Sequence, residues 1–355
     1  MTTSLYTPTT LGKLPLKNRV VMAPMTRSRA IGNVPNELMA SYYRQRAGAG
    51  LIIAEGTAPS PDGLGYARIP GLFSDAQVQG WQRVTDGVHA AGGKIFVQLM
   101  HTGRVGHAAN LPAGARILAP SAIAAPGEMW TDSSGMQAHP VPEAMSEAEI
   151  KQTIAAYATA AKRAIEAGFD GIELHAANGY LIDQFLNTAA NQRTDQWGGS
   201  VENRIRFAVE IAKASVAAVG ADRIGMRISP YGVFNGMVPD AEMDALYLRL
   251  IEELNTLKLV YIHIVDHSSM GAPEVSPELK ANIRAAFKGQ YILSGGYDAA
   301  RAQADLDARR GDLVAFGRPF ISNPDLVQKL QDGSALTAPD AATFYTPGEK
   351  GYTDY

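Results

Sequence analysis

The chain has 355 residues, of which 46% are hydrophobic and 19% are charged, and its formal net charge is −3. This composition is that of a folded globular protein and excludes an intrinsically disordered one. The small net charge gives no electrostatic signal for nucleic acid or for an anionic membrane surface. Because the sequence contains no cysteine, disulfides, thiolate nucleophiles and cysteine-bound zinc or iron–sulfur clusters are excluded as well.

The amino-terminal region shows no targeting signal. Residues 1–10 contain no basic stretch followed by an apolar one, as a secretory signal would require. No apolar run approaches the ~18 residues that a membrane-spanning helix needs. We therefore expect a cytoplasmic protein with no membrane and no nucleic-acid partner. Its oligomeric state, monomer or homodimer, is left open.

Eight short apolar runs rich in valine and isoleucine recur along the chain, and helical periodicity follows most of them. They cover residues 19–23, 51–54, 95–99, 172–174, 224–228, 260–264, 291–293 and 313–316. Such runs are typical of parallel strands that are buried on both faces. Eight β/α units without a break in composition predict an α/β fold, a closed (β/α)8 TIM barrel in which residues 1–355 form a single domain. An open, doubly wound sheet is the alternative, but the count of eight favours the barrel.

Two of the intervening helices have clear boundary signals. Ser146 followed by Glu149 forms a capping box, which predicts a helix start. Gly168 is expected just after the end of that helix, where a glycine can take the left-handed conformation. Ser200 similarly precedes a second amphipathic helix.

Two segments depart from the simple β/α repeat. Residues 5–17, with Gly12 and Pro15, predict a small hairpin that closes the bottom of the barrel. The interval between the third and fourth predicted strands is far longer than the ~30 residues of a βαβ unit. The excess, residues 107–142, is rich in Pro, Gly, Ser and Ala and lacks helical periodicity. We predict that it forms an excursion over the catalytic face, in the form of a hairpin lid.

Active sites of such barrels lie at the carboxyl ends of the strands, and the last two strand ends carry a candidate anion site. Gly295 and Gly296 would let the backbone approach a phosphate closely, and Gly317 is followed by Arg318, which can bind a phosphate in a bidentate manner. The other interpretation is two ordinary strand-to-helix turns with a surface arginine.

Two polar side chains interrupt otherwise apolar strands. Gln98 and Arg227 each need a partner where they are buried. That partner could be an internal salt bridge or a backbone group. Together with the anion site, the two side chains could instead hold the polar edge of a cofactor ring across the barrel mouth.

The densest group of polar residues follows the fourth strand. His175 and Asn178 could supply two N–H donors to one developing oxyanion, and the Tyr180 hydroxyl could deliver a proton. A structural interpretation is equally open at this point, with a histidine capping the strand, a turn asparagine and a core tyrosine.

The sequence resembles the old yellow enzyme family of FMN-dependent ene-reductases along its whole length, and most closely the classical branch of that family. The segments that carry the resemblance are 17–27 (KNRVVMAPMTR), 97–99 (VQL), 168–181 (GFDGIELHAANGYL), 191–200 (NQRTDQWGGS), 316–320 (FGRPF) and 351–355 (GYTDY). Such long, ordered matches are highly specific.

The resemblance implies a role for each candidate residue. His175 and Asn178 correspond to the pair that binds the activating oxygen of the substrate, and Tyr180 corresponds to the proton donor. The residues implied to bind FMN non-covalently are Pro24, Met25, Thr26, Gly56, Gln98, Arg227, Gly295, Gly296, Gly317 and Arg318. The residues implied to line the substrate site are Tyr66, Met100, Phe234 and Tyr352. Many classical members carry tryptophan in place of Met100, which is slimmer and more flexible.

The implied reaction is of the ping-pong type, with NADPH or NADH as the reductant. Hydride passes through FMN to the β-carbon of an activated alkene, an α,β-unsaturated carbonyl or nitro compound, and no metal is expected. Two alternatives are a non-enzymatic flavin-binding module and a metal-dependent barrel hydrolase or lyase. The latter would use His101, His175, His263 and His267, but the sequence lacks a clear HxH or paired-carboxylate arrangement.

Overall fold

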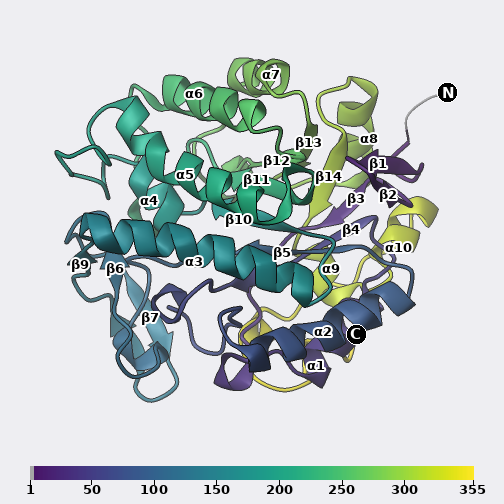
Figure 1. The fold of residues 1–355 in the computed structure, drawn as a ribbon. Helices are drawn as coiled ribbons and strands as arrows, with labels where there is room; N and C mark the ends of the chain where they lie inside the picture. Colours follow the sequence, from purple (N-terminus) through teal and green to yellow (C-terminus); the bar gives the residue numbers. More distant parts are fainter. Residues whose placement is uncertain (1–3) are drawn as a thin grey trace.

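The computed structural model describes residues 4–355, and eight parallel strands close into a barrel in the order β10-β11-β12-β13-β14-β3-β4-β5 (Figure 1). The strands are β3 (Val20–Met22), β4 (Leu51–Thr57), β5 (Ile95–Leu99), β10 (Gly171–Ala176), β11 (Ile224–Ile228), β12 (Tyr261–Val265), β13 (Gln290–Ser294) and β14 (Leu313–Phe316). The predicted (β/α)8 barrel is thus confirmed. Strand β4 runs three residues beyond the predicted apolar run, and its pairing with β5 shifts register between Ala54 and Thr57.

Helices surround the barrel and shield the outward-facing apolar side chains of its strands. They are α1 (Glu37–Gln45), α2 (Asp75–Ala90), α3 (Glu147–Glu166), α4 (Leu181–Leu186), α5 (Val201–Val219), α6 (Met243–Thr256), α7 (Pro277–Ala286), α8 (Ala299–Asp307), α9 (Pro319–Ser322) and α10 (Leu326–Asp332). Single-turn 3₁₀ helices cover Ile31–Asn33, Pro61–Gly63, Ala108–Asn110, Ala221–Arg223, Phe234–Gly236, Ser268–Met270 and Ala341–Thr343.

The predicted helix boundaries are confirmed. Ser146 caps α3 and forms a reciprocal capping box with Glu149, and Ser200 caps α5 through the N–H of Asn203. Gly168 follows the end of α3 with a φ of 87°, a conformation that is accessible to glycine without strain. Within the described residues, no helix is both long and apolar enough to cross a bilayer.

The amino-terminal hairpin closes one end of the barrel, as predicted. Its strands, β1 (Thr9–Leu11) and β2 (Leu14–Leu16), pair antiparallel. Leu11 and Leu16 are buried in a cluster with inward-facing apolar residues of the barrel strands. Gly12 takes a φ of 57°, and a Cβ there would lie 2.9 Å from Val260, so the hairpin turn needs glycine. Because the hairpin fills this end of the barrel, we look for the active site at the opposite end.

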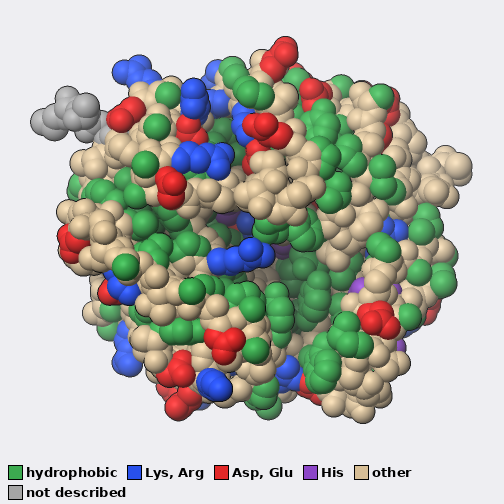
Figure 2. All heavy atoms as spheres, turned by 180° about the vertical axis from the view of Figure 1, so that it is seen from behind, with side chains coloured by type: hydrophobic (Ala, Val, Ile, Leu, Met, Phe, Trp, Pro, Cys, Tyr) green, Lys and Arg blue, Asp and Glu red, His purple; other side chains and the backbone are tan. Residues whose placement is uncertain are grey.

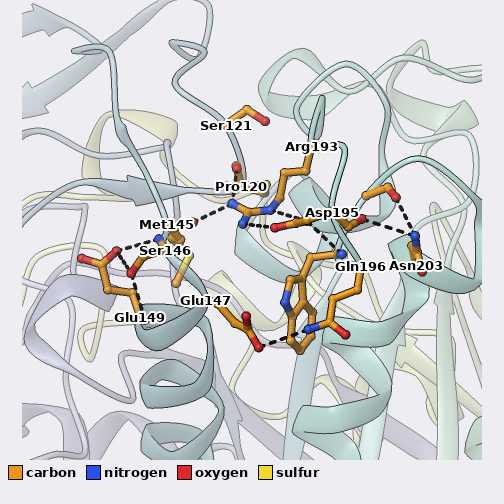
Figure 3. A network of polar contacts seen from close by, with 12 residues as sticks. Pro120, Ser121, Met145, Ser146, Glu147, Glu149, Arg193, Asp195, Gln196 and Asn203 are labelled. Carbon is orange, nitrogen blue, oxygen red and sulfur yellow. Dashed lines mark hydrogen bonds and ion pairs between the residues drawn. The ribbon is translucent and has the colours of Figure 1, made fainter.

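The predicted excursion contains a hairpin, at the lower left of Figure 1. Strands β7 (Glu128–Thr131) and β8 (Gly135–Ala138) pair antiparallel, and the base of the excursion is closed by parallel pairing of β6 (Leu118–Ala119) with β9 (Glu143–Ala144). One arginine joins both ends of this base (Figure 3). Arg193 donates to the carbonyls of Pro120 and Met145 at 3.0 and 2.6 Å, while its other nitrogens bind Asp195.

The tip of this hairpin is tied to the barrel loops. Arg68, on the loop after β4, forms an ion pair with Asp132 in the hairpin turn and donates to the carbonyl of Tyr345. The indole N–H of Trp130 also donates to Asp132, at 3.0 Å. The hairpin is therefore held at its base and at its tip.

Three fully buried arginines bind the carboxyl-terminal segment, residues 343–352. Arg27 donates to the carbonyl of Gly351 at 2.6 Å, and Arg29 donates to the carbonyls of Thr343 and Lys350. Arg46 donates to the carbonyls of Phe320 and Ile321 in α9. It also donates, at 3.4 Å, to the carbonyl of Tyr352. The guanidinium groups thus satisfy backbone carbonyls of a segment with little regular secondary structure.

Candidate active site

The barrel register brings polar side chains of four neighbouring strands together. His175 on β10 pairs with Arg227 on β11, and Arg227 pairs with His263 on β12. Two residues earlier on β10, Glu173 pairs with Gln98 on β5. All five side chains are buried, and they therefore form a polar layer within an otherwise apolar barrel.

The Glu173 carboxylate is the centre of this layer. It accepts hydrogen bonds from Gln98 Nε2 at 2.8 Å and from the Tyr261 hydroxyl at 3.0 Å, and it lies 2.8 Å from His263 Nδ1. Burial alone would raise the pKa of Glu173, but His263 and the positive charge of Arg227 hold it below its ordinary value. Glu173 is therefore ionised and fixes the orientation of the Gln98 amide.

Within residues 4–355, Arg227 is a buried cation whose side chain has neither a hydrogen bond nor an ion pair. Only 8% of the residue is exposed. His175 Nδ1 and the Ser294 hydroxyl are likewise buried and unpaired. Burial and the nearby charge of Arg227 hold the pKa of His175 well below its ordinary value, so this imidazole is neutral. The arrangement leaves a cation and polar groups available to a bound molecule.

The turn after β10 is built from two residues with positive φ, Asn178 at 62° and Gly179 at 75°. Its backbone is held by two side chains: the Asn178 N–H donates to Ser229 Oγ at 2.9 Å, and the Gly179 N–H donates to Asp183 at 2.8 Å. These bonds fix the turn that carries Asn178 and that leads into Tyr180, whose ring contacts His175.

Tyr180 lies between His175 and a cleft. Its ring makes an edge-to-face contact with His175, with centroids 5.0 Å apart, and its hydroxyl lies 3.0 Å from that of Tyr66. Burial raises the pKa of Tyr180 above its ordinary value, so the phenol keeps its proton at neutral pH. Met100 is buried in the apolar cluster against which Tyr66 and Tyr180 pack. A side chain at Gly56 would collide with Met100.

The cleft has a volume of about 750 Å³. Thr26, Tyr66 and Tyr180 form part of its wall, and the hairpin and the carboxyl-terminal segment supply much of the rest. Trp130, Met136 and Tyr345 are apolar lining residues with more than half of their surface exposed. Figure 2, which views the molecule from behind, shows a hollow around which apolar, basic and histidine side chains gather.

The residues predicted to bind phosphate follow two paired strands, β13 and β14, and are Gly295, Gly296, Gly317 and Arg318. Gly295 has a φ of 123°, and a Cβ there would overlap the carbonyl oxygen of Asp266. Gly317 lies beside the end of β3, because a Cβ on it would be 3.7 Å from Met25 Sδ. The side chain of Arg318 is exposed at the start of α9.

Three further candidates lie around this region. Pro24 is buried two residues after the end of β3. Phe234 is 37% exposed and makes an edge-to-face contact with His267, with ring centroids 4.6 Å apart. Tyr352 is fully buried and stacks on Tyr42 at 4.0 Å, and it is not among the residues that line the cleft. Its hydroxyl has no hydrogen-bond partner in residues 4–355.

The histidines of the metal-dependent alternative have separate partners. His101 Nδ1 accepts a hydrogen bond from the Gly103 N–H, His263 contacts Glu173, and His267 contacts Asn178. Among residues 4–355, no three His, Asp or Glu side chains are grouped so that they could hold a metal ion.

Sequence reasoning missed Glu173 and Arg68, and it considered His267 only as a metal ligand. Glu173 is a carboxylate inside an apolar run, and that burial signal could have marked it. His267 and Arg68 act on residues far away in the sequence, Asn178 and Asp132, and no local pattern indicates such pairs.

Comparison with known proteins identifies the family of this chain. Residues 4–337 match the model of the NADH:flavin oxidoreductase / NADH oxidase family. A probable flavin mononucleotide-dependent alkene reductase of Leishmania infantum is 41% identical, over 98% of this chain and 96% of the relative.

Two solved structures are similar over the whole chain. Morphinone reductase superposes with a TM-score of 0.96 at 44% identity, covering 100% of this chain and 96% of that one. The old yellow enzyme homologue from Zymomonas mobilis gives a TM-score of 0.94 at 41% identity, with 99% of each chain covered. The chain therefore belongs to the NADH:flavin oxidoreductase family as an old yellow enzyme homologue. It is an NAD(P)H-dependent flavin oxidoreductase that uses FMN.

Proposed function

We propose that this enzyme reduces the carbon–carbon double bond of α,β-unsaturated carbonyl and nitro compounds at the site formed by His175, Asn178 and Tyr180. The observation that carries the proposal is the contact of the His175 imidazole with the protonated Tyr180 phenol, at the end of the turn that also carries Asn178. His175 is neutral and contacts the Tyr180 ring, and the Asn178 amide nitrogen has no hydrogen bond within residues 4–355.

The unpaired groups of the barrel fit FMN. The Arg227 guanidinium would lie beside the polar edge of the flavin ring, and Gln98, oriented by Glu173, would bind the pyrimidine part together with the Gly56 backbone. Pro24, Met25 and Thr26 would contact the ring from the end of β3. The residues that would hold the phosphate are Gly295, Gly296, Gly317 and Arg318. When bound, FMN supplies hydride transfer from NADH or NADPH to the β-carbon of the alkene.

The side chains of this chain would act on the substrate as follows. His175 and Asn178 donate hydrogen bonds to the carbonyl or nitro oxygen, which withdraws electron density from the β-carbon. The negative charge that develops on this oxygen is stabilised, and one such donor is typically worth about 3 kcal/mol. Tyr180 donates its proton to the α-carbon and regains a proton from water. Tyr66, Met100 and Phe234 would limit the shape of the alkene.

The excursion of residues 107–142 would act as a lid, and residues 1–355 would work as a single FMN-binding domain in the cytoplasm. The ties of the hairpin through Arg193 and Arg68 support a fixed wall for the cleft. The apolar lining of the cleft suits uncharged alkenes, and the substrate would be a small molecule.

The test is a rapid-mixing experiment on the purified, FMN-loaded protein. NADH and NADPH should each be tried for anaerobic bleaching of the flavin absorbance, and 2-cyclohexenone or nitrostyrene should then restore it. Saturated cyclohexanone serves as the control. Flavin that is bleached by a nicotinamide but not restored by any activated alkene would contradict the proposal.

A further inference from the structure

The backbone of Asn178 is fixed on both sides. Its N–H donates to Ser229 Oγ at 2.9 Å, and its carbonyl accepts from Asn235 Nδ2 at 2.7 Å. The residue also occupies the left-handed region with a φ of 62°, where few other side chains are tolerated. With the backbone held in this way, the remaining freedom of Asn178 is rotation of its side chain.

One residue restrains that rotation. The Nε2 atom of His267 lies 2.7 Å from Asn178 Oδ1. An amide oxygen can only accept, so the proton of this hydrogen bond belongs to His267 Nε2. The Asn178 NH₂ group is then the free end of the amide, without a hydrogen bond to any of residues 4–355.

His267 is itself held firmly. It is 9% exposed, and its ring meets that of Phe234 edge to face at 4.6 Å. Burial and the positive charge of Arg227 lower the pKa of His267 to about 4, so at neutral pH the ring carries one proton. The contact with Oδ1 assigns this proton to Nε2.

We propose that His267 is a positioning residue, which binds the Asn178 amide oxygen and thereby directs the amide NH₂ group toward the activating oxygen of the substrate. The inference rests on the function proposed above for the same site. With the His267 proton on Nε2, a reversed amide would place its NH₂ group against this N–H and its oxygen against the substrate oxygen, and both contacts would be repulsive. The hydrogen bond from His267 also polarises the amide and makes its NH₂ group a better donor.

The test compares two substitutions of similar length and shape, His267→Gln, which keeps an N–H donor, and His267→Met, which has none. The readout is the dissociation constant of para-hydroxybenzaldehyde, whose phenolate should stack on oxidised FMN and give a long-wavelength charge-transfer band. We expect affinity to fall about five- to tenfold in His267→Met and less than about twofold in His267→Gln. Equal losses in the two variants, or none in His267→Met, would overturn the inference.

A double-mutant cycle separates action through Asn178 from direct action on the ligand. In the Asn178→Ala background, His267→Met should weaken phenol binding no further, because no amide remains to be positioned. Losses that simply add would show that His267 acts independently and would contradict the proposal. If the unsubstituted enzyme gave no charge-transfer band at all, the proposed function of the site would fail instead.

A second readout needs neither FMN nor substrate. Long-range ¹H–¹⁵N correlation spectra of the flavin-free protein should show His267 as a neutral ring with its proton on Nε2. The signal is assigned by its loss in His267→Gln. A His267 ring that carries its proton on Nδ1 could not donate to Asn178 and would overturn the assignment.

Discussion

The hydroxyl oxygens of Tyr180 and Tyr66 lie 3.0 Å apart, and the two rings meet edge to face at 6.1 Å. A hydroxyl can donate one hydrogen bond and accept others. If Tyr66 donates to Tyr180, the Tyr180 proton is free to point into the site. Tyr66 would then orient the acid without being the acid, and the two tyrosines should differ sharply when substituted.

Tyr180→Phe should leave reduction of the flavin by NADH or NADPH almost unchanged and slow reduction of 2-cyclohexenone by about 10²–10⁴-fold, as is typical of a lost general acid. The rate of nitroalkene reduction should fall less, because the nitronate product is stable without immediate protonation. Rapid mixing measures each half-reaction separately. Tyr66→Phe is the control and should slow enone reduction far less. If Tyr180→Phe slowed both half-reactions equally, Tyr180 would be a structural residue.

Arg227→Met should weaken FMN binding by about 30-fold or more, because it removes a buried cation that has no hydrogen bond or ion pair among residues 4–355. Any flavin that remains should have a lower reduction potential. Flavin content after dialysis and a potentiometric titration check both effects. Arg83→Met, at an exposed arginine of α2, is the control and should change neither. Full occupancy at an unaltered potential would place Arg227 away from the flavin.

The barrel could be predicted from the sequence because each strand is a short, largely apolar run that is followed by a helix, and most of these helices begin at a side-chain cap. These are local signals, and all eight strands were found. The site was found only in part. His175, Asn178 and Tyr180 share one strand end and are visible as a group, whereas the pairing of His267 with Asn178 depends on how β10 and β12 are placed in the closed barrel.

The surroundings of Tyr352 show a second limit of the sequence. The resemblance implies a place for this residue in the lining of the substrate site, and in the structure its ring stacks on Tyr42, a contact that the sequence does not indicate. The cause lies in Arg27, Arg29 and Arg46, which bind the backbone of that segment. Arginine–carbonyl contacts across some 300 residues leave no periodic pattern in a sequence.

Met100→Trp should change the stereochemical outcome for bulky β-substituted enones and leave 2-cyclohexenone turnover similar. Met100 is 1% exposed and packs against Gly56, so the larger ring has to displace its neighbours. We expect a loss of about 1–3 kcal/mol in the free energy of unfolding. Chiral analysis of the products and denaturant titration are the measurements. Met100→Leu is the volume-conserving control, and an unchanged product ratio in Met100→Trp would remove this position from the substrate site.

Arg193→Met should loosen the base of the hairpin, because it removes the donors to Pro120 and Met145 and the ion-pair partner of Asp195. Limited proteolysis within residues 120–142 should become faster, and KM should rise more than kcat falls. Arg206→Met is the matched control, since Arg206 binds the neighbouring Gln196 carbonyl but no residue of the excursion. Equal protease resistance in the Arg193 variant would show that the base is held by other contacts.

Asp183→Asn should become more stable relative to the unsubstituted protein as the pH rises from 5 to 8. Burial raises the pKa of Asp183 from 3.8 to about 7. The folded state therefore binds this proton more tightly than the unfolded state, and that contribution is lost as the pH rises through about 7. The difference in unfolding free energy should change by about 2 kcal/mol over this range. Urea titrations at both pH values measure it, with the exposed Asp86→Asn as the control. A pH-independent difference would mean that Asp183 is ionised in the folded protein throughout.

The three buried arginines that bind the carboxyl-terminal segment have a consequence for its dynamics. If residues 343–352 detached, the guanidinium groups of Arg27, Arg29 and Arg46 would lose carbonyl acceptors inside the protein, at a cost that one irregular segment could not recover. Fraying of this segment alone is therefore disfavoured. The buried amide protons at the two ends of the segment, those of Thr343, Gly351 and Tyr352, are hydrogen-bonded and should exchange slowly with solvent. These ends of the cleft wall are therefore held in place before any ligand arrives.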